Sequence, residues 1–284
     1  MQLMNYEYLE KSISEADLVL VGLGEEWVLT EDRMLEDMAE KNKAMYEIYK
    51  IAAEDEMYAD FVQVLTACYF MNYIPKELEN AYKNMYQILE NKNYFIVSLT
   101  VDPYLHRMGF KEERFVNPCG TFQKLQCAEG CNADLTDSGE LLESVMRVIA
   151  SSNTNQCNAR EILDACMQIV KTEHCEKCGG PVVFNRLDAK KYREEGYLQK
   201  WQIYMKWLQG TLNKNIVVLE AGVGMKLPSV IRWPFEKTVF YNQKATMFRV
   251  HEKFYQVNEE VAERAYGCKC NSVHMFSEKN LEAN

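Results

Sequence analysis

Four cysteines in two short pairs are the residues of this sequence whose types and spacing point most directly to chemistry. The first pair is Cys127-Ala-Glu-Gly-Cys131, and the second is Cys175-Glu-Lys-Cys178, which two glycines follow. Both spacings allow two thiolates to bind one ion, and four thiolates in tetrahedral geometry suit Zn²⁺ and leave no open position for water. The sequence therefore predicts a structural zinc site. The alternative is two unrelated pairs of reduced thiols.

Two glycine turns form a second group of candidate residues. The apolar run 17–22 leads into Gly-Leu-Gly, and the apolar run 215–221 leads into Gly-Val-Gly. Small residues at the carboxyl end of a buried strand let backbone N–H groups approach a phosphate. Such turns also occur in α/β proteins for packing reasons alone, and the sequence leaves both interpretations open. The glycines expected to contact a cofactor are Gly22, Gly24, Gly222 and Gly224.

An α/β fold must position these residues. Apolar runs at 17–22, 94–98, 215–221 and 245–250 predict buried strands, and the glycine-free stretch 31–90 predicts helices. Buried strands separated by helices form a doubly wound, mainly parallel sheet that binds ligands at the carboxyl ends of its strands. We expect 1–119 to form the first part of this domain with a helical insert at 31–90, 120–185 to form a small helical and zinc-ribbon lobe, and 186–284 to form the second part.

Charge and composition limit the classes of function. The 284 residues carry a formal net charge of -10 at pH 7, which argues against nucleic acid as a partner because its phosphates require a basic surface. No apolar run approaches the ~20 residues that a membrane helix needs, and no signal peptide is evident. We therefore expect a cytoplasmic protein with no membrane partner. The six cysteines outside the two pairs show no regular framework; they are Cys68, Cys119, Cys157, Cys166, Cys268 and Cys270.

The order of these motifs along the whole chain resembles that of the sirtuin family. The resemblance lies in Tyr94-Phe-Ile-Val-Ser98 leading to Asp102, in His174-Cys-Glu-Lys-Cys-Gly-Gly-Pro181, and in Leu219-Glu-Ala-Gly-Val-Gly224 with Trp233-Pro-Phe235. It is greatest for the macrodomain-linked branch of bacterial sirtuins, which resemble protein ADP-ribosyltransferases in activity more than deacetylases. The resemblance implies a Rossmann-like sheet beside a zinc lobe, with NAD or ADP-ribose as the ligand. It also implies ADP-ribosyl transfer or deacylation of an acylated or carrier-protein substrate.

The sequence departs from the sirtuin pattern at positions that carry the family's chemistry. Sirtuins follow the first glycine turn with Ala-Gly and, further on, an Arg that closes over NAD, whereas this chain has Glu25 and Glu26. A carboxylate beside a pyrophosphate is repulsive unless a cation intervenes, so we expect weak affinity for NAD that a divalent cation improves. In the loop after the next strand the family carries Asn-x-Asp, and this chain has Thr100-Val-Asp102. The resemblance implies catalytic roles for Thr100 and Asp102, and a cofactor contact for Asp102.

Cys119 stands where sirtuins have the His, or the macrodomain-linked branch the Gln, of their general base. A free thiol has a pKa near 8.5 and is mostly protonated at neutral pH. Cys119 is therefore a catalytic candidate as a base or as a nucleophile toward the anomeric carbon. The alternative, which we favour, is a small thiol that fills the space of a lost imidazole. His251 replaces the usual Asn against the adenosine ribose and is expected to contact the cofactor, and His174 is expected to hydrogen-bond a ligand sulfur.

Three hypotheses of function follow. The first is an NAD-consuming ADP-ribosyltransferase or deacylase with atypical catalytic residues, which the glycine turns and Asp102 favour. The second is a catalytically degenerate sirtuin-fold module that binds NAD, ADP-ribose or another nucleotide, which the lost base favours. The third is a protein-interaction module without nucleotide binding. NAD hydrolysis separates the first hypothesis from the others, and a thermal-shift titration with NAD and ADP-ribose separates the second from the third.

Overall fold

The chain forms two compact units. The computed structural model describes residues 6–151 and 158–279, so that Cys157 lies outside the described residues. The first unit combines Met1–Val28, Lys76–Cys119 and Tyr197–Asn284, and the second combines Leu29–Pro75 and Gly120–Gly196. Residues 31–90, expected to form one helical insert, contribute helices to both units.

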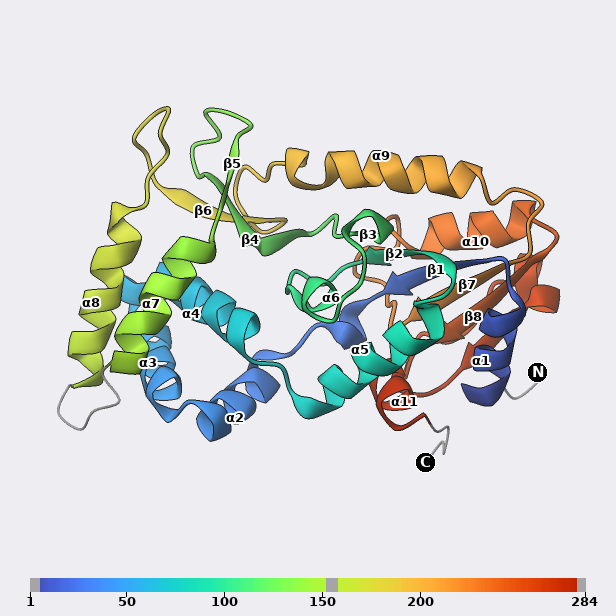
Figure 1. The fold of residues 1–284 in the computed structure, drawn as a ribbon, viewed down its shortest axis with the longest axis horizontal. Coiled ribbons are helices and arrows are strands. Elements are labelled where there is room, and N and C mark those ends of the chain that lie inside the picture. The colour runs from blue at the N-terminus through green and yellow to red at the C-terminus, as the bar shows by residue number, and fades with distance from the viewer. Residues whose placement is uncertain (1–5, 152–157, 280–284) are drawn as a thin grey trace. The chain divides into compact units, whose positions relative to one another are not determined.

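The first unit is built on a six-stranded sheet with the order β3-β2-β1-β7-β8-β9, in which every neighbouring pair is parallel (Figure 1). The strands are β1 (Leu18–Leu23), β2 (Asn93–Ser98), β3 (Phe115–Val116), β7 (Ile216–Ala221), β8 (Ala245–Val250) and β9 (Ala265–Cys268). The predicted parallel α/β sheet is confirmed, and the four predicted strands are its four central ones. The two edge strands were not predicted.

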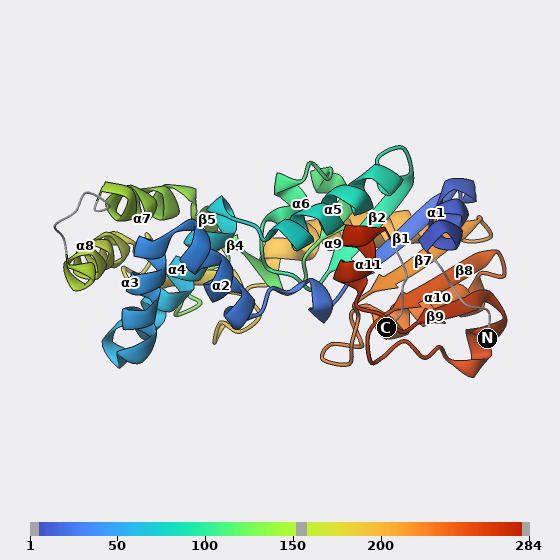
Figure 2. The ribbon, with the colours of Figure 1, turned by 90° about the horizontal axis from the view of Figure 1, so that it is seen from below.

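Helices cover both faces of this sheet, which is why its central strands carry mostly apolar side chains on both sides. All six residues of β1 and of β7 are buried. One face packs on α9 (Glu195–Gln209) and α10 (Arg232–Tyr241) through a core that includes Leu20, Val218 and Phe235. The other face carries α1 (Tyr6–Glu15), α5 (Lys76–Leu89) and α11 (Ser272–Glu278), which lie in front of the strands in Figure 2. The layered, doubly wound arrangement is therefore the predicted one.

The second unit combines helices with a small antiparallel sheet of order β5-β4-β6. Its helices α3, α4, α7 and α8 pack on one another, and α2 packs on α3. The strands are β4 (Gly120–Cys127), β5 (Leu135–Asp137) and β6 (Val182–Arg186). The helices are α2 (Glu31–Lys41), α3 (Lys43–Glu54), α4 (Ala59–Asn72), α7 (Gly139–Ser151) and α8 (Ala159–Thr172).

Short elements complete the fold. They are helix α6 (Tyr104–Arg107) and the 3-10 turns η1 (Glu25–Trp27), η2 (Glu56–Tyr58), η3 (Glu112–Arg114) and η4 (Glu259–Arg264). Among the described residues, no helix combines the length and the apolar character that crossing a membrane requires.

Candidate functional site

The two glycine turns and His251 come together at the carboxyl edge of the six-stranded sheet. Hydrogen bonds continue past the ends of the strands: the Gly24 N–H donates to the Ala221 carbonyl at 2.9 Å, and the Gly222 N–H donates to the Val250 carbonyl at 2.8 Å. His251 follows β8 at the same edge, where its N–H donates to a carbonyl of β9. Residues far apart in sequence thus form one group within the first unit.

Each glycine of the two turns has a packing reason for its small size. A Cβ on Gly24 would lie 2.2 Å from the Gly222 carbonyl oxygen, so the two turns touch backbone to backbone. Gly222 has a φ of +66°, and a Cβ there would lie 2.6 Å from the Glu26 Cβ. A Cβ on Gly22 would lie 2.4 Å from the Ile231 Cγ2 atom, beside the start of α10. Packing alone therefore accounts for Gly22, Gly24 and Gly222.

The Glu25 carboxylate binds the backbone of the second glycine turn. Its Oε2 accepts a hydrogen bond from the Gly224 N–H at 2.6 Å, and its Oε1 accepts one from the Lys226 N–H at 3.0 Å. A Cβ on Gly224 would approach this carboxylate to 3.1 Å, so glycine leaves room for it. These N–H groups belong to the turn from which a phosphate contact was expected. The turn therefore does bind an anion, and that anion is a side chain of the chain itself.

Glu26 ties the first glycine turn to the C-terminal helix. Its Oε2 accepts hydrogen bonds from the Ser272 N–H and hydroxyl, each at 2.7 Å, and its Oε1 accepts one from the Glu252 N–H at 2.8 Å. The buried Trp27 indole also donates to the Ser272 hydroxyl, at 3.1 Å. Ser272 is the first residue of α11. Glu26 therefore holds the first glycine turn to the start of α11 and to the segment after β8.

His251 is neutral in this network. Its Nδ1 accepts hydrogen bonds from the Lys253 N–H at 2.9 Å and the Phe254 N–H at 3.2 Å, which assigns the ring proton to Nε2. Burial lowers the His251 pKa, and the nearby Glu26 and Glu25 carboxylates oppose this without reversing it. The contact of 3.2 Å between Nδ1 and the Glu26 Oε1 is therefore not an ion pair at neutral pH.

The Asp102 carboxyl has a pKa that suits proton transfer at neutral pH. Burial raises its pKa from 3.8 to about 7, although hydrogen bonds, including one from the Tyr104 N–H at 3.0 Å, oppose the shift. Its neighbour Thr100 is fully buried, and the Thr100 hydroxyl lies 2.9 Å from that of Ser98. Asn117 donates to the Thr100 carbonyl at 2.9 Å and so fixes the loop. A carboxyl group of this pKa can both donate and accept a proton near pH 7.

Cys119 lies in an apolar environment. It belongs to the core that α9 and α10 form on the sheet, and only 7% of it is exposed. Burial raises the pKa of its thiol to about 11, Lys226 lowers it by a smaller amount, and Glu25 raises it further. The thiol is therefore protonated at neutral pH. This agrees with the interpretation of Cys119 as a small buried side chain and weighs against a thiolate base or nucleophile.

The four paired cysteines form a group that could hold a metal ion in the second unit. Their sulfur atoms all lie within 4.8 Å of one another. The Cys127 and Cys178 sulfurs are 3.6 Å apart, and those of Cys131 and Cys175 are 3.5 Å apart. Four sulfurs about 2.3 Å from one tetrahedral ion would be about 3.8 Å apart, so the spacing fits. The two predicted pairs are thus one cluster.

Backbone turns shape this cluster and favour the thiolate form of Cys175. The Gly179 N–H donates to the Cys175 carbonyl at 2.7 Å, and Gly179 has a φ of +68°, which glycine adopts without strain. Backbone N–H groups of Cys178 and Lys177 lower the pKa of Cys175 to about 6. The Asn132 amide lies 3.1 Å from the Cys131 sulfur and donates to it.

His174 does not take the predicted role in this cluster. The His174 Nδ1 lies 2.7 Å from the Thr172 carbonyl oxygen, so this ring nitrogen bonds to backbone and not to sulfur. Asn132 makes the predicted kind of contact instead, at 3.1 Å from the Cys131 sulfur and 3.3 Å from the Cys175 sulfur. An Asn directly after a ligand cysteine is a signal that the sequence contained, and it was missed.

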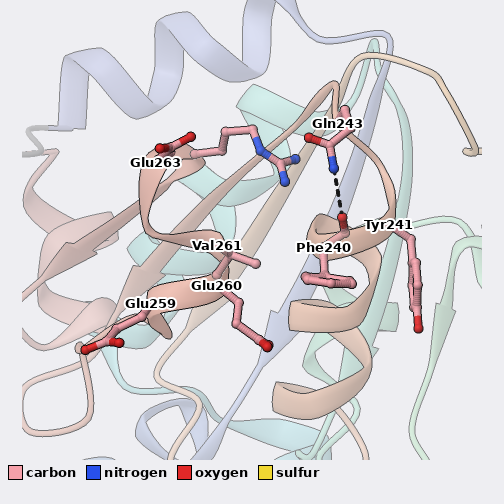
Figure 3. A pocket seen from close by; sticks show the side chains of 8 residues that line it. Phe240, Tyr241, Gln243, Glu259, Glu260, Val261 and Glu263 are labelled. Carbon is pink, nitrogen blue, oxygen red and sulfur yellow. Dashed lines mark hydrogen bonds between the residues drawn. The ribbon is translucent and has the colours of Figure 1, made fainter.

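A surface pocket at the opposite edge of the six-stranded sheet does not suit a nucleotide. It lies between the end of α10 and η4, which lead into the amino ends of β8 and β9 (Figure 3). Glu259, Glu260 and Glu263 line it, together with Phe240 and Tyr241. The nearby Arg264 guanidinium donates to two backbone carbonyls. The carboxylates here would repel phosphates, so the candidate nucleotide site stays at the carboxyl edge.

Comparison with solved structures identifies the architecture. A structure described as a Sir2 homologue–NAD complex aligns over 98% of this chain and 94% of that chain, with 12% identity and a TM-score of 0.53. The chain has the sirtuin fold. A structure described as Sir2 bound to acetylated peptide aligns over 97% of both chains, with 12% identity and a TM-score of 0.52. The predicted resemblance to sirtuins is thus confirmed at the level of the fold. No protein-family model matches the chain.

Relatives similar in sequence carry names from ADP-ribose chemistry. A protein ADP-ribosyltransferase of Staphylococcus aureus is 20% identical over an alignment of 273 residues, and the match covers 91% of this chain and 81% of that protein. A probable bifunctional ADP-ribose hydrolase/ADP-ribosyltransferase of Fusarium oxysporum f. sp. cubense is 25% identical over 148 residues. That match spans 51% of this chain but only 23% of the fungal protein.

Proposed function

We propose that this chain binds NAD at the carboxyl edge of its parallel sheet and transfers ADP-ribose from NAD to an acceptor. The observation that carries the proposal is an anion-binding turn at this edge: the Gly224 and Lys226 N–H groups already hold a carboxylate, at 2.6 and 3.0 Å. Backbone donors of this kind bind phosphates in nucleotide sites. The sirtuin fold and the name of the staphylococcal relative support NAD as the ligand.

Asp102 is the residue that we assign to proton transfer. When ADP-ribose is transferred, the bond between C1′ and the nicotinamide nitrogen breaks, and nicotinamide leaves with the bonding electron pair. The acceptor forms the new bond to C1′ and loses a proton. With a pKa of about 7, Asp102 is ionised in about half of the molecules at neutral pH and can accept that proton. Thr100, fully buried beside it, would position the loop rather than react.

Protein deacylation is a less favourable use of the same site. In the sirtuin reaction a general base must deprotonate a ribose hydroxyl, and such a base typically contributes ~10²–10⁴-fold to the rate. The position of that base is held by Cys119, whose thiol pKa is about 11 because it is buried. We therefore infer that deacylation of acyl-lysine peptides is slow, and that ADP-ribosyl transfer is the main activity.

A silent nucleotide-binding module is the second candidate function. The position of the family's general base favours it, because Cys119 stands there and its buried thiol, with a pKa of about 11, is protonated at neutral pH. In both candidates an incoming phosphate must first displace the Glu25 carboxylate from the turn. The two candidates differ in whether bound NAD is turned over.

We further propose that the four-cysteine cluster binds a structural Zn²⁺. The chemistry of the ligands supports zinc, because four thiolates suit this ion and leave no position for water or substrate. The spacing of 3.5 and 3.6 Å between paired sulfurs supports one shared ion. The role of the ion would be to hold β4 and the turn before β6 together.

The deciding experiment measures nicotinamide release and label transfer together. Purified chain is incubated with NAD labelled in the adenosine half, with and without a crude protein fraction from the source cells as acceptor. We expect nicotinamide release, covalent labelling of an acceptor or of the chain itself, and loss of both in Asp102→Asn. Calorimetry with ADP-ribose on the same variant controls for binding. Binding without turnover in the wild type would establish the silent module, and the absence of both would refute nucleotide binding.

A further inference from the structure

Three sulfur atoms outside the four-cysteine cluster lie together in the first unit. Cys268 ends β9, Cys270 follows two residues later, and Met275 lies in α11. The Cys268 and Cys270 sulfurs are 3.4 Å apart, and the Met275 sulfur lies 3.8 Å from that of Cys270. Both cysteines are free thiols. Cys268 and Met275 are buried, whereas Cys270 is partly exposed and leaves a route from solvent.

The 3.8 Å between the Cys270 and Met275 sulfurs is the distance of two ligands on one ion, and the 3.4 Å between the Cys268 and Cys270 sulfurs is a few tenths of an ångström shorter. Two sulfurs about 2.3 Å from a shared metal lie about 3.8–4.0 Å apart, at tetrahedral or trigonal angles. A disulfide would bring the sulfurs to about 2.05 Å. The paired sulfurs of the four-cysteine cluster, at 3.5 and 3.6 Å, have similar spacing. A thioether takes no part in disulfide exchange, so the position of Met275 is explained by packing or by a metal, and not by thiol redox chemistry.

The local backbone arranges the three sulfurs before any ion binds. The Asn271 side chain accepts a hydrogen bond from the His274 N–H at 3.1 Å and starts α11. The Met275 N–H donates to the Asn271 carbonyl at 3.0 Å, which places Met275 one turn after the cysteine pair. The Cys268 carbonyl accepts a hydrogen bond from the His251 N–H at 3.1 Å. Hydrogen bonds thereby fix both ends of the segment 268–275 that carries the three sulfurs.

We propose that Cys268, Cys270 and Met275 form a three-sulfur site for monovalent copper. Thiolate and thioether ligands are soft and select Cu(I) over hard cations such as Mg²⁺ and Ca²⁺. A structural Zn²⁺ site needs four ligands, usually Cys or His, and the described residues bring only these three sulfurs together here. No ligand sulfur belongs to a glycine turn, so the proposal does not rest on the proposed NAD binding.

The test uses the full-length chain with its four-cysteine cluster first loaded with zinc. Cu(I) is supplied anaerobically from a chromophoric chelator that competes for it, and a zinc indicator follows zinc release. We expect the wild type to retain one copper ion per chain while keeping its zinc. The double substitution Cys268→Ser with Cys270→Ser should abolish retention. Cys68→Ala, a buried cysteine of the second unit, is the control and should retain copper.

Met275→Leu keeps the test decisive if the cysteine variant folds poorly. Leu and Met have similar volumes, so this variant should fold normally. Loss of the thioether ligand should weaken copper affinity by about tenfold or more, equivalent to about 1.4 kcal/mol. Three results would overturn the proposal: copper retained by the double variant, copper bound only as zinc leaves, or affinity unchanged in Met275→Leu. Formation of a Cys268–Cys270 disulfide under mild peroxide, with no copper bound by the reduced chain, would assign the pair to redox chemistry instead.

Discussion

The carboxylate of Glu25 can be tested as an internal competitor of nucleotide phosphates. It accepts two hydrogen bonds from backbone N–H groups of the turn that we assign to the cofactor. Substitution by Ala removes the competitor, removes a negative charge and leaves both N–H groups available. We therefore predict that Glu25→Ala binds ADP-ribose and NAD more tightly than the wild type does.

The size of the effect follows from the hydrogen bonds. A bond to a charged group contributes about 1.5–3 kcal/mol net, and the partial exposure of Glu25 argues for the lower value. Two such bonds favour the closed state by about 3 kcal/mol, which leaves the open state at roughly 1%. The apparent affinity of the wild type is then reduced about 100-fold, and Glu25→Ala should recover most of that factor. Glu25→Gln retains one acceptor oxygen and should recover less.

Isothermal titration calorimetry with ADP-ribose measures the effect directly. Glu252→Ala is the matched control, because it removes an exposed carboxylate from the same region without opening the turn. We expect little change in that variant, and a change equal to that of Glu25→Ala would mean that general repulsion and not occupation limits binding. The reasoning is refuted if Glu25→Ala remains folded and binds ADP-ribose no better than the wild type.

Four further predictions concern stability and chemistry. Cys178→Ser, or a strong chelator, should destabilise the second unit by several kcal/mol, and limited proteolysis should cut within 120–196 before it cuts the sheet of the first unit. The Asp102 pKa is raised from 3.8 to about 7, so between about pH 4 and pH 7 Asp102 is protonated in the folded chain and ionised in the unfolded chain. The free energy of unfolding should therefore fall as pH rises through that window, by on the order of 4 kcal/mol. Asp102→Asn should remove this fall, which denaturant titrations at a series of pH values measure. Cys119→Ala should change NAD turnover by far less than the ~10²–10⁴-fold of a lost general base, and a loss of that size would show that the thiol reacts. Glu26→Gln should lower the free energy of unfolding by about 1–3 kcal/mol, because the NH₂ of the new amide would face a backbone N–H donor, and hydrogen exchange of α11 should become faster.

The central fold could be predicted because its strands are buried on both faces. Runs such as 18–21 and 216–219 are apolar without interruption, a pattern typical of a covered parallel sheet. The edge strands gave no such signal: β3 has only two residues, and β9 reads Ala-Tyr-Gly-Cys. A short edge strand owes its conformation to the neighbour that it pairs with, which a sequence pattern does not reveal.

The candidate site was predicted in its residue types but not in its contacts. The spacing within each local cysteine pair was enough to predict that the four cysteines form one group. Glu25 was expected only to repel a phosphate, whereas its partners Gly224 and Lys226 lie in a distant segment that folding brings to it. The shift in the Asp102 pKa could not be predicted from the sequence either, because it depends on burial by the folded first unit.

The pairing of β1 has a consequence for synthesis of the chain. Its neighbours are β2 on one edge and β7 on the other, where Leu18 pairs with Ile216. A ribosome therefore releases an apolar central strand long before the partner for its second edge exists. Such an unpaired edge favours association with other nascent chains. Production of this protein should accordingly depend on chaperones that shield the N-terminal strand, and a chain that stops before β7 should be recovered as aggregate.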